Sequence, residues 1–174
     1  LMNLWRLEEL DPRDDRHLTM VEAQETSHRL ARKSLAYNGL EAQVTALWGD
    51  LRESVPDGPF ELITGSPPYI PLGKGVVSPH HQRAACRMEL RGTIADYALA
   101  AARVLEPEGR FVCCFAGQDP RAEQALADAG FHLLHRTDVY FRAQLPPTIC
   151  LLTAALQPGP TVRDRLTIRD VGGE

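Results

Sequence analysis

Residues 60–69 read FELITGSPPY, a short apolar run that ends abruptly in a serine, two prolines and a tyrosine. The aromatic and β-branched side chains of residues 60–64 are typical of a buried strand. The two prolines fix the backbone and remove hydrogen-bond donors, which an ordinary turn does not require. We therefore predict a strand over 60–64 that leads directly into a chemically specialised segment, Ser66-Pro67-Pro68-Tyr69.

Strand and helix patterns alternate on both sides of this stretch, which predicts an α/β fold: a Rossmann-like sheet with helices on both faces. The expected helices cover residues 1–10, 26–38, 93–105 and 120–129. The expected strands cover 17–22, 43–47 and 110–115, followed by an antiparallel pair at 131–141 and 148–156. We expect an irregular loop over 70–81 and a peripheral tail from residue 157 onward.

The helix expected over 26–38 is amphipathic and ends at Gly39. Its expected inward side chains are Leu30, Ala31, Leu35 and Tyr37. Cys113 and Cys114 are neighbours in the strand expected over 110–115, so their side chains point to opposite faces of the sheet. We therefore expect core thiols there and no shared metal ion.

The composition sets further limits on function. The chain has 174 residues and a formal net charge of −4, which argues against broad, non-specific binding to nucleic acids. No apolar run approaches the roughly 20 residues that span a membrane, and the first residues lack the pattern of a signal peptide. The four cysteines have no zinc-binding spacing. We expect a cytoplasmic protein without a metal site.

Polar features follow three consecutive expected strands: Glu22, Asp50 and residues 66–69. Ligands of open parallel sheets bind at the carboxyl ends of the strands. There Glu22 can accept hydrogen bonds from both hydroxyls of a ribose, and Asp50, followed by Leu51, can accept one from an adenine amino group. Each acid taken alone is equally well explained as a charge near a helix N-terminus. Together with residues 66–69, they predict a nucleoside site.

Residues 66–69 have the chemistry needed to methylate an amino nitrogen. The carbonyls of Ser66 and Pro67 can accept both amino hydrogens, which turns the nitrogen lone pair toward a methyl donor and stabilises the charge of the transition state. The ring of Tyr69 can stack on a planar base or amide, a contact worth about 1–3 kcal/mol for a nucleobase. The predicted catalytic residues are Ser66, Pro67, Pro68 and Tyr69.

The sequence resembles the class I S-adenosylmethionine-dependent methyltransferases with an Asn/Asp/Ser-Pro-Pro-Tyr motif, and in particular the bacterial tRNA (adenine-N(6)) methyltransferases that act next to the anticodon of a valine tRNA. The resemblance runs through residues 21–22, 38–40, 49–50, 66–69, 87–92 and 168–170. It implies that Glu22 binds the cofactor ribose, Asp50 its adenine, and residues 66–69 the target of a tRNA substrate. Leu51 and Ser66 are the other expected cofactor-binding residues. Residues 1–156 would form the methyltransferase domain and 157–174 its tail.

The chain departs from that pattern at two places. Position 66 is usually Asn in the tRNA and release-factor enzymes, whereas Ser-Pro-Pro-Tyr is common among cytosine-N(4) DNA methyltransferases. The glycine-rich loop that holds the methionine part of the cofactor is missing, because no glycine precedes Gly39. We expect the domain to lack its first strand through a truncated start or a split, and the chain alone to bind the cofactor poorly.

Alternatives to a tRNA methyltransferase stay open. The motif also occurs in release-factor glutamine methyltransferases and in DNA amino-methyltransferases, and a non-catalytic remnant that binds RNA or a partner protein is a further hypothesis. His80 and His81 lack the partners of a metal site. Four basic residues after the motif are candidate contacts to the phosphates of a nucleic acid. They are Lys74, Arg83, Arg87 and Arg91. The alternative is that they are ordinary charged residues on a solvent-exposed helix face.

Overall fold

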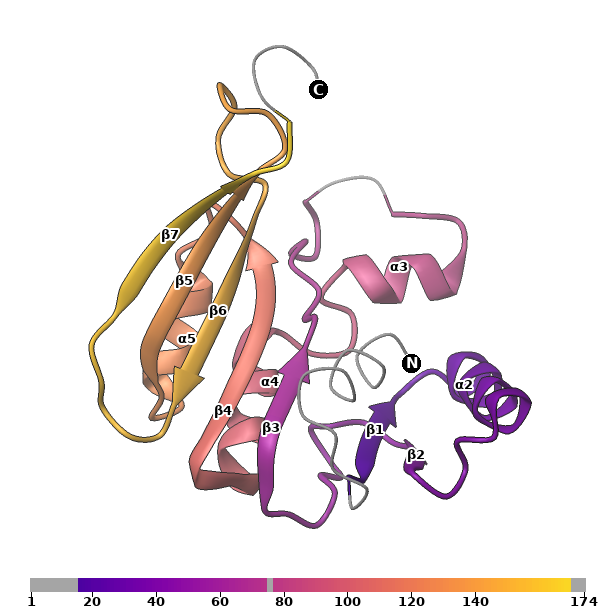
Figure 1. The fold of residues 1–174 in the computed structure, drawn as a ribbon. Coiled ribbons are helices and arrows are strands. Elements are labelled where there is room, and N and C mark those ends of the chain that lie inside the picture. Colours follow the sequence, from indigo (N-terminus) through magenta and orange to yellow (C-terminus); the bar gives the residue numbers. More distant parts are fainter. Residues whose placement is uncertain (1–15, 75–76, 170–174) are drawn as a thin grey trace. The chain divides into compact units, whose positions relative to one another are not determined.

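The computed structural model describes residues 16–74 and 77–169, apart from the side chains of His81 and Arg83. The chain forms two compact units, one ending at Gly49 and the other beginning at Asp50 (Figure 1). The helix expected over residues 1–10 lies outside the described residues.

The first unit is a strand–helix–strand motif. Strand β1 (Leu18–Glu22) and strand β2 (Val44–Trp48) pair in parallel, with Glu22 opposite Trp48, and helix α2 (Glu25–Asn38) connects them. Parallel neighbours require such a crossover, because a tight turn cannot return the chain in the same direction. The strands expected over 17–22 and 43–47 are confirmed to within one residue.

Helix α2 ends at Gly39, as expected. Gly39 has a φ of 66° and donates its N–H to the carbonyl of Ala36, a left-handed conformation that glycine adopts without strain. Leu35 is buried, but Leu30 and Tyr37 are 58% and 91% exposed, so their expected inward orientation is wrong. Two five-residue strands offer a narrow surface, which covers only the stripe of α2 around Leu35. That stripe packs with Val44, Leu18, Met20, Leu40 and Ala46.

The second unit contains a mixed five-stranded sheet in the order β3-β4-β6-β5-β7. Strands β3 and β4 are parallel, β6 is antiparallel to β4 and β5, and β7 runs parallel to β5. The strand bounds are β3 Phe60–Gly65, β4 Leu105–Ala116, β5 His132–Tyr140, β6 Ile149–Ala155 and β7 Val162–Thr167. The predicted α/β class and the final antiparallel pair are confirmed.

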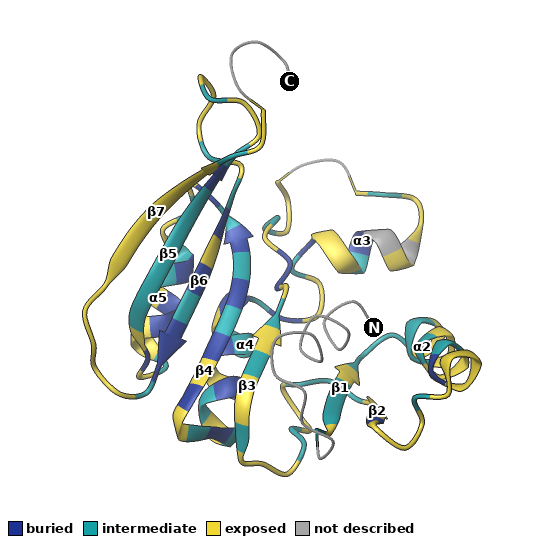
Figure 2. Cartoon of the chain, in the orientation of Figure 1, coloured by how far each residue is buried: buried dark blue, intermediate teal, exposed yellow. Residues whose placement is uncertain are grey.

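Strand β4 forms the centre of the hydrophobic core. Its side chains alternate, so that Phe111, Cys113 and Phe115 are buried while their neighbours are half-exposed (Figure 2). Helices α4 (Ile94–Val104) and α5 (Arg121–Asp128) pack their alanines and Leu126 against this face. Burial raises the pKa of the Cys113 thiol to about 12, so it stays protonated. The expected opposite orientation of Cys113 and Cys114 agrees with their burial.

The helices of this unit differ in how far the sequence predicts them. Thr93 and Asp96 form a reciprocal cap at the start of α4, in which the Thr93 N–H donates to the Asp96 carboxylate over 2.7 Å. Helix α4 lies where it is expected. Helix α5 also lies where it is expected, although it has no side-chain cap. Helix α3 (His81–Arg87) was not predicted, because it follows a loop rich in glycine and proline and has only seven residues.

The tail has more structure than its composition indicates. Residues 162–167 form β7, which pairs along β5 from His135 opposite Val162 to Tyr140 opposite Thr167. Five of its six residues are exposed, so β7 is an edge strand that adds backbone hydrogen bonds and little core. A strand with this polar composition has no hydrophobic alternation that would reveal it.

Candidate functional site

Glu22 lies at the carboxyl end of β1, directly before α2. Its Oε1 accepts a 2.7 Å hydrogen bond from the backbone N–H of Gln24, and its carbonyl accepts one of 3.2 Å from the N–H of Gly49. The indole N–H of Trp48 donates to the carbonyl of Ala23. These bonds tie the ends of β1 and β2 together. A carboxylate has several lone pairs, so the contact with Gln24 is compatible with a further pair of ribose hydroxyls.

Asp50 begins the second unit and is fixed by Arg52. The backbone N–H and Nε of Arg52 donate to Oδ1 over 3.0 and 2.9 Å, and its Nη2 donates to Oδ2 over 2.6 Å. The hydrogen bond from the Arg52 side chain is the main cause that lowers the pKa of Asp50 to about 2, and Arg91 adds a smaller electrostatic contribution. Asp50 is therefore a permanently charged, oriented acceptor at neutral pH.

Replacing Arg52 by alanine should raise the pKa of Asp50 from about 2 toward its ordinary value of 3.8. Because the folded-state value lies below the unfolded one, the pair stabilises the protein above about pH 4 and loses this effect as the pH falls to about 2. The variant should be less stable at neutral pH, and its free energy of unfolding should change less with pH between about pH 4 and pH 2. Carboxyl NMR titration and urea unfolding measure both effects.

The control for this variant is Arg103→Ala, which removes an exposed arginine from α4. It should leave the titration of Asp50 unchanged. A pKa of Asp50 that stays near 2 in Arg52→Ala would show that another group holds the carboxylate in its charged form.

The predicted catalytic segment lies at the exit of β3, as expected. Pro67 and Pro68 are buried, whereas Ser66 and Tyr69 are exposed, so the prolines anchor a short arch that presents its two outer side chains. The Ser66 hydroxyl accepts a 3.4 Å hydrogen bond from the Cys114 thiol of β4. Beyond the arch, Ile70 pairs with residues 87–89, since its N–H donates to the Arg87 carbonyl and its carbonyl accepts from the Glu89 N–H.

Tyr69 rests on the end of the core. Its ring meets the buried ring of Phe115 edge to face, with centroids 6.2 Å apart and an angle of 77°, and 39% of Tyr69 remains exposed. Edge-to-face contacts of this kind stabilise the orientation of both rings. The arrangement gives Tyr69 a fixed inner edge and leaves the rest of its surface available to a planar group.

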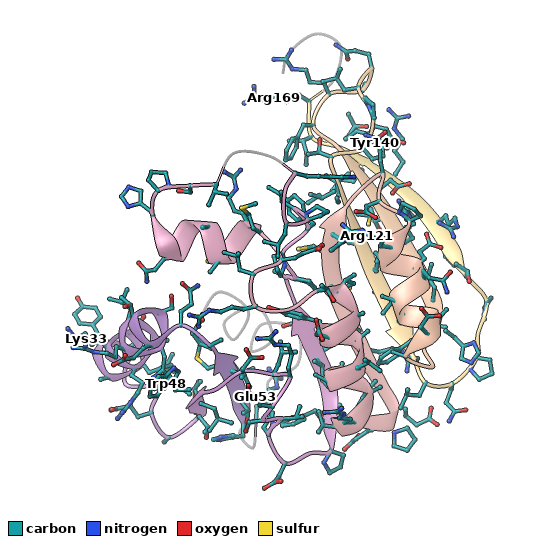
Figure 3. The ribbon with its side chains drawn as sticks, turned by 180° about the vertical axis from the view of Figure 1, so that it is seen from behind. Lys33, Trp48, Glu53, Arg121, Tyr140 and Arg169 are labelled. Carbon is teal, nitrogen blue, oxygen red and sulfur yellow. The ribbon has the colours of Figure 1, made fainter. Side chains whose placement is uncertain are left out.

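Arg121 supports this arrangement from the first turn of α5, at the carboxyl end of β4 (Figure 3). Its guanidinium lies 5.7 Å from the centroid of Phe115 and donates over 2.7 Å to Glu89. It also forms a two-pronged ion pair with Asp119, whose pKa it lowers. Arg121 therefore links the segment after the motif, the ring beneath Tyr69 and α5. Sequence reasoning missed Arg121 and Phe115, because neither belongs to a motif.

The predicted phosphate contacts are distributed over several places in the second unit. Lys74, Arg87 and Arg91 are exposed, and the side chain of Arg83 lies outside the described part. Lys74 is close enough to Asp119 to lower its pKa, and Arg91 acts in the same way on Asp50. Lys74 thus lies near Asp119 at the carboxyl end of β4, and Arg91 lies near Asp50. Leu51, expected beside the cofactor adenine, is half-buried.

The shared cofactor site of Glu22 and Asp50 stays a prediction, because the two residues belong to different units. Asp50, Ser66 and Tyr69 belong to the same unit. No helix in the described part of the chain has the length and apolar character needed to cross a membrane. Within that same part, His, Cys, Asp and Glu side chains do not gather in threes or more in a way that could hold a metal ion.

Comparison with solved structures establishes the fold. A predicted O-methyltransferase from Agrobacterium tumefaciens matches 88% of this chain and 70% of its own, with a TM-score of 0.62 and 17% identity. A glycopeptide N-methyltransferase solved with S-adenosyl-L-methionine matches 80% of this chain and 72% of its own, with a TM-score of 0.54 and 14% identity. The chain has the class I methyltransferase fold. This fold does not by itself determine an activity, since a [4+2]-cyclase matches it with a TM-score of 0.61.

Sequence comparison finds relatives of one kind among the proteins with the methyltransferase fold. No family model matches the chain. A curated protein of Citrobacter koseri named tRNA1(Val) (adenine(37)-N6)-methyltransferase is 30% identical over 168 residues, which cover 92% of this chain and 66% of that protein. A protein of the same name from Erwinia tasmaniensis is 33% identical over 113 residues, 63% of this chain and 44% of its own length. The chain thus spans less than two thirds of each relative.

Proposed function

We propose that this chain carries the catalytic part of an S-adenosylmethionine-dependent methyltransferase that modifies the N6 amino group of an adenine in tRNA. The observation that carries the proposal is the exposed Tyr69 on a proline-anchored arch, in a chain 30% identical to a tRNA adenine methyltransferase over nearly its whole length. A tRNA substrate would place the protein in the cytoplasm, as the sequence predicts.

Two of the residues present have the chemistry to hold the adenosine part of the proposed cofactor, while the glycine-rich loop expected to hold its methionine part is missing from the residues before Gly39. S-adenosylmethionine supplies an electrophilic methyl group on a sulfonium centre, together with ribose hydroxyls and an adenine amino group that act as donors. Asp50 is held in its charged form by Arg52, so it provides the oriented acceptor that an adenine amino group requires. Glu22 has the same chemistry at the end of β1 and would bind the ribose.

The arch explains how the target would be presented. Tyr69 would stack on the target adenine, while the carbonyls of Ser66 and Pro67 would each accept a hydrogen bond from its amino group. These two hydrogen bonds would turn the N6 lone pair toward the electrophilic methyl group that the cofactor supplies when bound, so that the nitrogen would gain the methyl group and the cofactor would leave as the neutral thioether. The acceptors stabilise the positive charge on nitrogen, which then releases a proton. Positioning supplies most of the remaining acceleration.

The test is nucleoside mass spectrometry of tRNA from a strain in which the gene has been deleted. N6-methyladenosine should disappear from one tRNA, return to its normal level with the wild-type gene and return only to a reduced level with a Tyr69→Ala gene. An unchanged level in the deletion strain would overturn the tRNA proposal. Methyl transfer to a release-factor peptide or to DNA would then favour one of the alternatives drawn from the sequence, and no transfer to any of them would favour a non-catalytic binding module.

A further inference from the structure

An open groove of about 610 Å³ lies at the carboxyl end of β4. Its size falls within the range of roughly 300–1,000 Å³ that is common for small-ligand sites. One wall is the turn from β4 to α5 and the other is the end of the loop that leads into β6. The lining residues are Ala116, Gly117, Gln118, Asp119, Pro120, Leu145, Pro146, Pro147 and Thr148.

The groove begins next to the proposed target site. Tyr69 contacts Phe115, and the Arg121 guanidinium that lies over the Phe115 ring binds Asp119, which lines the groove. The Gly117 N–H donates to the Thr148 carbonyl over 3.1 Å, which fixes the distance between the two walls. A chain of nucleotides with one base on Tyr69 would therefore reach the groove with an adjoining nucleotide.

The groove is lined by both apolar and polar side chains. Leu145 is 52% exposed, and Pro120 and Pro146 are exposed beside it. Proline rings and a leucine side chain offer surfaces against which the face of a base can pack. Gln118, Asp119 and Thr148 supply donors and acceptors for the edge of that base.

The charges around the groove favour a polyanion. Asp119 is already neutralised by Arg121 over 2.6 Å and lies near Lys74. On the loop between β5 and β6, Arg142 is exposed. Arg165 of β7 reaches the same loop, since its Nη2 donates over 2.7 Å to the Ala143 carbonyl while its guanidinium carbon lies 3.9 Å from the centroid of Tyr140. Positive charges that can follow the phosphate backbone are one of the features of single-stranded nucleic acid sites.

We propose that this groove binds the nucleotide that adjoins the target adenosine in the RNA strand. The base packs against Leu145 and the prolines, and its phosphates lie near Lys74, Arg142 and Arg165. The inference rests on the proposed function, because it takes the target adenosine to lie on Tyr69. It adds a second subsite, which explains how an enzyme with a net negative charge selects one RNA loop.

The test compares Leu145→Glu with Leu99→Glu, a matched change on α4, where Leu99 is 49% exposed. Binding of the full-length protein to an RNA hairpin that carries the target adenosine is measured by fluorescence anisotropy. Leu145→Glu should weaken binding roughly tenfold, within the range expected for one lost base contact, and Leu99→Glu should bind like the wild type. A 4-thiouridine next to the target adenosine should crosslink to residues 145–148.

Equal affinities of both variants and the wild type, or crosslinks only to other peptides, would overturn the groove assignment. Methyl transfer to the hairpin is measured separately from binding. If the wild-type protein binds the hairpin and Leu145→Glu weakens this binding, but no methyl group is transferred, the proposed function is contradicted and the groove assignment stands. A Leu145→Glu protein that loses methyl transfer to a release-factor peptide and keeps its RNA affinity would show that the groove serves a protein substrate instead.

Discussion

Replacing Tyr69 by alanine should lower methyl transfer by roughly 10- to 100-fold while leaving the affinity for S-adenosylmethionine unchanged. Loss of a stacked base costs about 1–3 kcal/mol, and each 1.4 kcal/mol corresponds to about tenfold in rate. The side chain is 39% exposed and rests edge-on against Phe115, so its removal opens no cavity in the core. Steady-state kinetics and calorimetric titration of the cofactor measure the two effects.

Two variants make this result specific. Tyr69→Phe keeps the ring and should retain most of the turnover, because stacking needs the π-face and not the hydroxyl. Tyr37→Ala removes an equally large ring that is 91% exposed on α2, and it should have no effect. Equal losses of cofactor affinity and turnover in Tyr69→Ala would mean that Tyr69 holds the cofactor and does not present the target.

Replacing Phe115 by alanine should reduce the free energy of unfolding by about 3–5 kcal/mol, the usual cost of truncating a buried aromatic ring. Phe115 has no exposed surface and belongs to the main core cluster. It is also the ring against which Tyr69 and Arg121 are placed. Each molecule of the variant that remains folded should therefore transfer methyl groups more slowly than a folded wild-type molecule. Urea unfolding and single-turnover kinetics provide the two measurements.

The matched control is Phe141→Ala, in which the same side chain is removed from a position that is 50% exposed. Surface substitutions usually change stability by less than about 0.5 kcal/mol, so this variant should unfold like the wild type. If both substitutions cost the same, the stability of the second unit would not depend on packing at the end of β4.

The sequence predicts the parts of this fold that local patterns determine. The apolar run over 60–64 is a strand because its residues favour one, and the prolines after Ser66 end it wherever the rest of the chain lies. Gly39 ends α2 for a similarly local reason, since its φ of 66° suits glycine. The placement of Glu22 at the end of β1 and of Asp50 just after β2 follows from the same alternation.

The parts that the sequence does not predict depend on tertiary context. Tyr37 has the spacing of an inward side chain but is exposed, because the strands beneath α2 are too short to cover it. Strand β7 is mostly polar and exposed, and it exists through its pairing with β5. Arg121 and Glu89 are 32 residues apart and meet only in the folded unit, so no spacing rule identifies the support beneath Tyr69.

The loop between β5 and β6 contributes to the groove but hardly to the core. Phe141 and Leu145 are exposed, and the main hydrophobic cluster draws its members from the flanking strands and from α4 and α5. Because the loop adds little to the core, a different segment grafted between Tyr140 and Ile149 should leave the stability of the protein nearly unchanged. Such a graft would change the groove and therefore which ligand the groove binds. Under the proposed role in RNA binding, changes of target can therefore begin at this loop without redesigning the interior.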